Sequence, residues 1–324
     1  MKMTSSGIKS ESWKGFAVIT VLLLAGFGLL LKNVRWSSPA IASETLQQRT
    51  FPSPAEAGAA LDNAAKKNDQ AALAQILGVY MKALLTTGDA AADGAAISGF
   101  ASKYQQMNRW VDMSDGSRVL YIGADNFAFP VPLAKNPDGQ WYFDAVAGAE
   151  ELRARDIGRN ELLAIDACAA LGNAQELYFQ SSDPQQYAQR IVSTPGKQDG
   201  LYWPVPETQG SSPLGHLSKF SKTSLASYSA DQPFVIDGYN VRILTAQGAN
   251  ADGAAKNYIV DGKMTGGFAI LATPVKYAET GIMTFMIGQD GAVYERDFGP
   301  DTAKPAAAIE AYNPDENWSP VTND

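Results

Sequence analysis

The spacing of the apolar residues changes from a helical period to a period of two near Arg109. Just before this point, Ile97, Phe100 and Tyr104 recur at the three- and four-residue intervals of one helical face. The segments 109–113 and 117–123 follow the period of two that is typical of half-buried strands. Helices followed by a run of strands exclude an all-helical fold and predict the α+β class.

The first half of the chain is predicted to form one α+β domain over residues 43–147. Ser53 and Pro54 provide an N-cap and a first-turn proline for a first helix, and two more helices are expected at 71–77 and 95–107. A four-strand antiparallel sheet is expected, with strands at 109–113, 117–123, 127–133 and 140–146. This order resembles the cone-shaped fold of the nuclear transport factor two-like and cystatin-like proteins, and the resemblance implies a pocket between the helices and the sheet.

The second half is predicted to form another α+β domain over residues 148–318, with residues 319–324 as a tail. It begins with a long helix at 148–179, whose first half is charged and solvated. The apolar face of its second half is expected to consist of Leu162, Ile165, Ala169, Leu171 and Leu177. A wrapping loop follows over residues 181–230, and an antiparallel meander is expected with strands at 239–246, 257–261, 267–273, 282–287 and 292–297. A hairpin turn at Gly288–Gly291, which includes Asp290, is expected to join the last two strands.

The N-terminus has the features of an export segment. Lys2, Lys9 and Lys14 precede an uninterrupted uncharged run over residues 15–31. Ala40-Ile41-Ala42 is the small-residue pattern that a signal peptidase recognises, which predicts cleavage between Ala42 and Ser43. Because the apolar run is nearly long enough to span a bilayer, residues 1–42 are either a signal peptide or an uncleaved anchor. We expect a periplasmic or secreted protein, or one anchored in the membrane and facing the periplasm.

The net charge and the single cysteine limit which partners and which disulfide bonds we expect. The formal net charge is −8, which disfavours binding to nucleic acid because the phosphate backbone is also negative. Membrane contact is expected only through the N-terminal segment, if it is uncleaved. The single cysteine, Cys168, cannot form an internal disulfide, and its small apolar neighbours predict a buried structural thiol.

Six stretches of the chain carry a family resemblance: Ile157–Leu162, Asp199–Pro204, Ser212–Gly215, Arg242–Gly248, Lys263–Ala269 and Gly281–Phe285. They resemble a bacterial envelope family, the domain of unknown function numbered 2950, over residues from about Phe51 to Trp318. The resemblance implies a place in the cell envelope and carries no established activity. The second half is also similar to the globular head of type IV pilin-like proteins, in its order of helix, loop and meander, although a whole domain separates this helix from the N-terminal segment.

The sequence contains no recognisable catalytic motif. The only histidine, His216, lies in a Pro/Gly-rich loop, and no Gly-x-Ser-x-Gly motif occurs. One histidine and one cysteine do not make a zinc site. Asn250, Asp252 and Gly253 lie close together, but no glutamate closes a calcium loop. We therefore predict no catalytic, cofactor-binding or metal-binding residues and no cofactor.

Two groups of residues remain candidates for a functional role. Tyr202 and Trp203 are a candidate contact point, because aromatic rings dominate interface energetics. Arg109, Tyr121 and Asp144 are candidates for lining a pocket in the first domain. The favoured hypothesis is a non-enzymatic module that binds or organises an envelope protein or a small molecule. The alternative is a small-molecule-pocket enzyme that uses carboxylates of the first domain.

Overall fold

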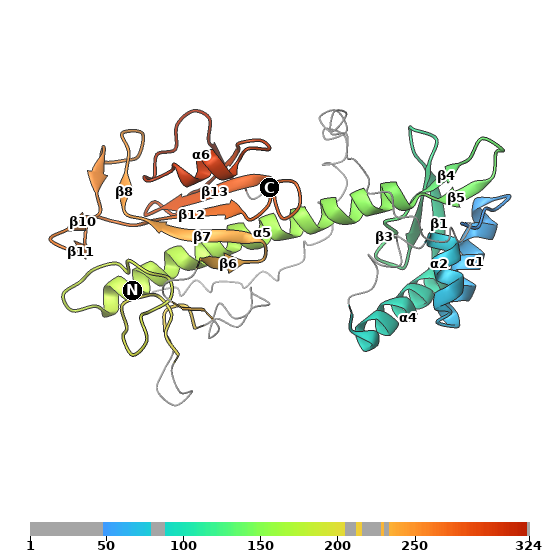
Figure 1. Cartoon of the computed structure of the whole chain (residues 1–324), viewed down its shortest axis with the longest axis horizontal. Coiled ribbons are helices and arrows are strands. Elements are labelled where there is room, and N and C mark those ends of the chain that lie inside the picture. Colours follow the sequence, from blue (N-terminus) through green and yellow to red (C-terminus); the bar gives the residue numbers. More distant parts are fainter. Residues whose placement is uncertain (1–47, 79–87, 205–211, 216–227, 230–232, 323–324) are drawn as a thin grey trace, which may run out of the picture. The chain divides into compact units, whose positions relative to one another are not determined.

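The computed structural model describes residues 48–78, 88–204, 212–215, 228–229 and 233–322 (Figure 1). The export segment, with Ala40, Ala42 and Ser43, and the sole histidine, His216, lie outside these ranges. Within them, no helix is both long enough and apolar enough to cross a membrane.

The described part of the chain begins with three helices, each of which starts at a side-chain cap. The helices are α1 (Pro54–Lys66), α2 (Gln70–Leu77) and α4 (Ala90–Gln106). Ser53 accepts the backbone N–H of Glu56 at 3.2 Å, as the sequence predicts. Asp69 and Asp89 cap the next two helices in the same way, so that polar residues at the ends fix where each helix begins.

A first antiparallel sheet follows, to which the described part of the chain contributes five strands: β1 (Asn108–Asp112), β2 (Arg118–Ile122), β3 (Phe127–Ala128), β4 (Leu133–Lys135) and β5 (Trp141–Phe143). The strand order is β1-β2-β4-β5, and β3 pairs with β2. The prediction of one strand over 127–133 was wrong: Pro130 and Pro132 have no N–H to donate and interrupt the ladder between β3 and β4.

The three helices pack against this sheet around a first hydrophobic core. Its fully buried side chains include Phe51, Leu61, Leu120, Leu133 and Phe143. Val146, which we expected in a strand of this core, is 68% exposed because it lies in the first turn of the following helix. The α+β class is confirmed, whereas the likeness to a cone fold stays a prediction.

Helix α5 (Ala145–Ser181) has 37 residues and contributes to two cores. Ala145, Ala149 and Leu152 in its first turns pack against the first core. Its second half belongs to a second core through a stripe of mostly small side chains: Ala164, Ala167, Cys168, Leu171 and Ala174.

The predicted apolar face of this helix was partly wrong. Leu162 and Leu177 are 67% and 52% exposed. A helix turns by about 100° per residue, so Leu162 lies about 180° around the axis from Leu171, on the side opposite to the buried stripe. Leu177 lies about 120° from Leu171, outside the edge of that stripe. Only Leu171 of the three predicted leucines is buried, and Cys168 is buried beside it as expected.

A second antiparallel sheet carries the second core, and the described residues contribute six strands to it: β6 (Phe234–Ile236), β7 (Tyr239–Leu244), β12 (Ala269–Pro274), β13 (Met283–Gly288), β14 (Val293–Asp297) and β15 (Ser319–Pro320). The order is β15-β14-β13-β12-β7-β6, and α5 packs on β12 and β13 (Figure 1). The hairpin turn between β13 and β14 at Gly288–Gly291 is confirmed. Ser319 and Pro320, which we assigned to the tail, pair with β14 as an edge strand.

The described residues of the second half also form two small ladders and a short helix, α6 (Ala303–Ala307). The ladders pair β8 (Ala246–Gln247) with β9 (Lys256–Asn257), and β10 (Ile259–Val260) with β11 (Lys263–Met264). The described part of the loop after α5 packs onto the second core through Ile191, Val192 and Leu201. Whether the two halves are separate domains that divide near residue 147 stays a prediction.

Candidate binding pocket

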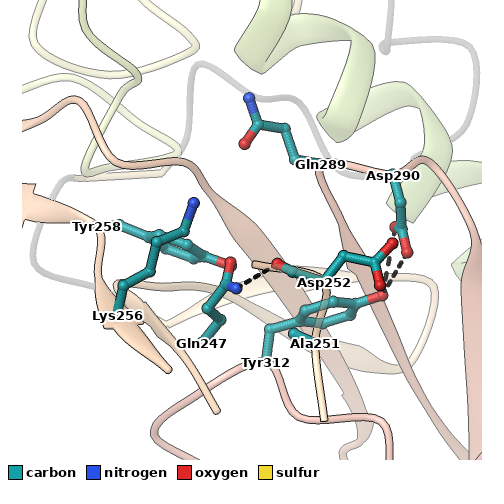
Figure 2. A pocket seen from close by; sticks show the side chains of 8 residues that line it. All are labelled: Gln247, Ala251, Asp252, Lys256, Tyr258, Gln289, Asp290 and Tyr312. Atoms are coloured by element: carbon teal, nitrogen blue, oxygen red, sulfur yellow. Dashed lines mark hydrogen bonds between the residues drawn. The ribbon is translucent and has the colours of Figure 1, made fainter. Parts of the chain in front are cut away.

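A pocket with a cavity volume of about 350 Å³ lies beside the β8–β9 ladder (Figure 2). It is lined by Gln247, Ala251, Asp252, Lys256, Tyr258, Gln289, Asp290 and Tyr312. These residues come from three places in the chain: the β8–β9 hairpin and the residue after it, the turn between β13 and β14, and the segment that follows α6. All of them belong to the second half of the chain.

The floor of the pocket is buried and polar. Gln247, Tyr258 and Tyr312 are each less than one-tenth exposed. The amide nitrogen of Gln247 donates to the carbonyl oxygens of Asp252 at 2.6 Å and Ala254 at 2.7 Å. Its amide oxygen accepts the hydroxyl of Tyr258 at 3.1 Å. Because both ends of the carboxamide are bonded, the floor is held in one conformation.

Tyr312 is placed by a close approach to the backbone of β13. A Cβ atom at Gly288 would come within 2.6 Å of the tyrosine ring, so only glycine leaves room for it. The hydroxyl of Tyr312 donates to the two carboxylate oxygens of Asp290 at 3.0 and 3.3 Å. Asp290 also accepts the backbone N–H of Ala292 at 3.2 Å, which orients its carboxylate within the hairpin turn.

Both phenols of the pocket keep their protons at neutral pH. Burial, with a smaller contribution from the charge of Asp290, raises the pKa of Tyr258 to about 12. Burial and the same carboxylate also raise the pKa of Tyr312. The two side chains are therefore hydrogen-bond donors of fixed orientation.

The rim of the pocket is charged and exposed. Figure 2 shows the ammonium group of Lys256 on one side and the carboxylates of Asp252 and Asp290 on the other. Within the described ranges, no hydrogen bond or ion pair engages the carboxylate of Asp252 or the ammonium group of Lys256. The ammonium nitrogen of Lys256 lies 5.9 Å from the centroid of the Tyr258 ring. Gln289 is held by a hydrogen bond of 2.6 Å from its amide nitrogen to the hydroxyl of Tyr187. The rim thus offers polar groups that a ligand can bind.

The segment with Asn250, Asp252 and Gly253, which we considered as a calcium loop, has one of its carbonyl groups engaged. The carbonyl oxygens of Asp252 and of the following Ala254 accept the side-chain amide of Gln247. Among the residues that the structure describes, no group of three or more His, Cys, Asp or Glu side chains could hold a metal ion.

The predicted pocket residues of the first half take part in separate local contacts. Arg109 and Tyr121 are opposite each other on β1 and β2, with the guanidinium carbon 4.6 Å from the ring centroid. Arg109 also donates to the side-chain oxygen of Asn126 at 3.2 Å. Asp144 is the N-cap of α5, where its carboxylate accepts the backbone N–H groups of Val146 and Ala147 at 3.0 Å. A pocket shared by Arg109, Tyr121 and Asp144 stays a prediction.

Tyr202 and Trp203, the predicted contact point, follow the segment that wraps the second core. Tyr202 is half-buried and packs against this core, and its backbone exchanges hydrogen bonds of 2.8 Å with Ile191 and Ser193. Trp203 is also half-buried. Their role in binding a partner stays a prediction.

Sequence reasoning missed most of the pocket. Asp252 was noticed only as part of a calcium loop, and Asp290 only as part of a turn. No local pattern in the sequence indicates the floor residues Gln247, Tyr258 and Tyr312. They form the floor of the pocket only because segments far apart in the chain come into contact. Tyr312 bonds through its backbone to Ala246 and Gly248 at 2.9 and 2.8 Å, which is a relationship that no periodicity contains.

The comparisons with known proteins agree with the family resemblance. Residues 48–321 match the family described as "Protein of unknown function (DUF2950)", which covers most of the chain. No curated protein and no solved structure matches the chain significantly. The likeness of the second half to type IV pilin heads is therefore not confirmed.

Proposed function

The chain belongs to the family described as protein of unknown function (DUF2950), and we propose that it is an exported, non-enzymatic binding protein that holds a small polar ligand in the pocket beside β8 and β9. The observation that carries this proposal is the contrast between floor and rim. The floor is buried and bonded in place, whereas the rim presents charged groups that have no ion-pair partner among the described residues. A pre-organised concave site with a few fixed polar groups is typical of small-molecule binding.

The chemistry of the site favours binding over catalysis. A general base at neutral pH needs a pKa near that pH, and burial moves the phenols of Tyr258 and Tyr312 away from it. The only thiol is equally unsuited to act as a nucleophile, because full burial raises the pKa of Cys168 to about 12. The phenols and the thiol therefore supply no base or nucleophile at neutral pH, which supports binding over catalysis.

The place of action is proposed from the sequence of the N-terminus. The positive residues, the apolar run and the Ala40-Ile41-Ala42 pattern support export, with the binding half outside the cytoplasm. Cleavage before Ser43 gives a periplasmic or secreted protein, and an uncleaved segment gives one anchored in the membrane. In both cases the pocket lies outside the cytoplasm and is open to small molecules of that compartment.

A thermal-shift screen with small polar metabolites tests the proposal. A ligand that binds only the folded protein raises its melting temperature. Asp252→Trp fills the rim without removing any side-chain hydrogen bond of the floor, so ligands that stabilise the wild type should not stabilise this variant. Lys263→Trp, on an exposed position of β11 outside the pocket, is the matched control and should respond like the wild type.

NMR spectra of a bound ligand decide between binding and catalysis. The proposal expects the ligand to be recovered unchanged after prolonged incubation with the protein. Turnover of the ligand would contradict the non-enzymatic part. A screen in which no compound stabilises the wild type more than Asp252→Trp would contradict the pocket itself.

A further inference from the structure

We infer that the ligand of this pocket is a zwitterion with a free amine and a free carboxylate, such as an amino acid or a short unblocked peptide. This inference rests on the proposed function and names the class of its ligand. It is carried by the separation of unlike charges across the rim: Lys256 lies on one side, and Asp252 and Asp290 lie on the other (Figure 2).

The carboxylates of Asp290 and Asp252 differ in the hydrogen bonds that they already accept. Asp290 accepts hydrogen bonds from Tyr312 and from the backbone of Ala292, which fix its orientation. Asp252 makes no such side-chain bond within the described chain. A ligand amine can therefore bind Asp252 directly and gain the longer-range attraction of Asp290. Charge-assisted hydrogen bonds of this kind are shorter and stronger than neutral ones.

Lys256 is positioned to bind the other end of the ligand. It lies on β9 directly opposite Gln247, so that the buried floor fixes the backbone from which its side chain extends. Its separation from Asp252 and Asp290 leaves the ammonium group without an internal carboxylate partner among the described residues. A ligand carboxylate that approaches Lys256 can form an ion pair with its ammonium group.

A neutral ligand fits this arrangement less well. A ligand that fills the cavity displaces part of the water around Lys256 and Asp252, and a neutral ligand offers these charges no partner in return. An amine alone satisfies the carboxylate side only, and a carboxylate alone satisfies the lysine side only. A zwitterion satisfies both, and a cavity volume of about 350 Å³ has room for a molecule of that size.

Isothermal titration calorimetry on the protein in the form isolated from cells tests the inference. The probes are a panel of free amino acids and unblocked dipeptides, followed by the N-acetyl and the C-terminal amide derivatives of the tightest-binding member. Each blocked derivative should bind at least about tenfold more weakly, because it loses one charge-assisted contact. Blocked derivatives that bind as tightly as the parent compound would overturn the inference.

Two variants assign the ends of the ligand. Asp252→Asn should remove the preference for a free amine and leave the preference for a free carboxylate. Lys256→Gln should do the reverse. Lys263→Gln, on an exposed residue outside the pocket, should bind like the wild type. If both pocket variants weakened all compounds equally, the assignment of ends would be wrong.

The outcomes separate this inference from the proposed function. If the metabolite screen yields a pocket ligand without an amine or without a carboxylate, the inference falls and the binding function stands. If neither the screen nor the zwitterion panel yields a ligand whose binding is abolished by Asp252→Trp, the inference and the proposed function are both wrong.

Discussion

The side-chain amide of Gln175 bonds to both backbone polar groups of Ala188. Its nitrogen donates to the carbonyl oxygen of Ala188 at 2.9 Å, and its oxygen accepts the N–H at 2.8 Å. Gln175 is fully buried, so this pairing fastens the loop after α5 to the helix in the way that a strand pairs with its neighbour. Gln175→Leu leaves both groups of Ala188 without their partner, which should lower the free energy of unfolding by about 2–5 kcal/mol.

Urea unfolding followed by circular dichroism measures this loss. Gln180→Leu is the matched control, because the same substitution lies on an exposed position of the same helix and should change stability by less than about 0.5 kcal/mol. Equal effects of the two substitutions would contradict the role of Gln175.

The two faces of α5 should respond differently to a charge. Leu171→Asp buries an unpaired carboxylate in the second core and should destabilise the protein by about 3–5 kcal/mol or more. Leu162→Asp places the same charge on the exposed face, where lower helix propensity and the nearby Asp166 cost about 1 kcal/mol or less. Denaturant midpoints of the two purified variants give the comparison, and a severe effect of Leu162→Asp would refute the exposed placement.

Asp144 is expected to act as a cap of α5. Asp144→Ala removes the acceptor for the N–H groups of Val146 and Ala147 and should cost about 1 kcal/mol of stability. Asp144→Asn keeps an acceptor and should cost less, although it loses the favourable charge at the helix N-terminus. Chemical denaturation of both variants distinguishes them. An asparagine variant as unstable as the alanine variant would argue that the charge, and not the cap, matters.

Glu295 should titrate above the usual range of a glutamate. Burial, and then the negative charge of Glu161, raise its pKa above 4.5. The folded state therefore holds the proton more tightly than the unfolded state. The resulting contribution to stability is fully present below pH 4.5 and is lost as the pH rises through the raised pKa of Glu295.

Glu161→Gln tests the electrostatic part of this shift. The glutamine oxygen can still accept the N–H groups of Ile282 and Met283, which Glu161 accepts at 2.8 and 3.0 Å, but its charge is gone. The pKa of Glu295 should fall towards its usual value, as followed by the carboxyl carbon shift in an NMR titration. An unchanged titration of Glu295 would exclude the influence of Glu161.

Export predicts a defined N-terminus for the mature protein. Mass spectrometry of the protein from a membrane-free periplasmic fraction should give Ser43 as the first residue, because Ala40 and Ala42 occupy the two small-residue positions before it. An intact N-terminus in the membrane fraction would establish the anchor instead. An intact N-terminus in the cytoplasm would reject export altogether.

Much of the secondary structure could be predicted because it is encoded locally. The cap at Ser53, the helical spacing of Phe100 and Tyr104, and the turn at Gly288–Gly291 each depend on a few neighbouring residues, and all three agree with the structure. The errors also have local causes. Two prolines divide the strand expected at 127–133, and Leu162 was assigned to the buried face by its apolarity although its angular position puts it on the other side.

The pocket could not be predicted, because it depends on contacts between distant segments. Gln247 and Asp290 meet Tyr312 only after the sheet has formed, and none of the three stands in a pattern that indicates a site. The need for glycine at position 288 becomes apparent only when the ring of Tyr312 is seen against it. Tertiary contact, rather than composition or spacing, defines this site.

Because α5 contributes to two cores, the two cores are expected to form one after the other as the chain leaves the ribosome or a translocation channel. The first core closes with side chains from Phe51 to Leu152, all of which emerge early. The second half of α5 cannot pack against its sheet until β13 has been synthesised, more than a hundred residues later. Until then Ile165, Leu171 and Phe179, which pack into the second core of the folded protein, have no sheet to cover them, so this interval is when aggregation of the nascent chain is expected.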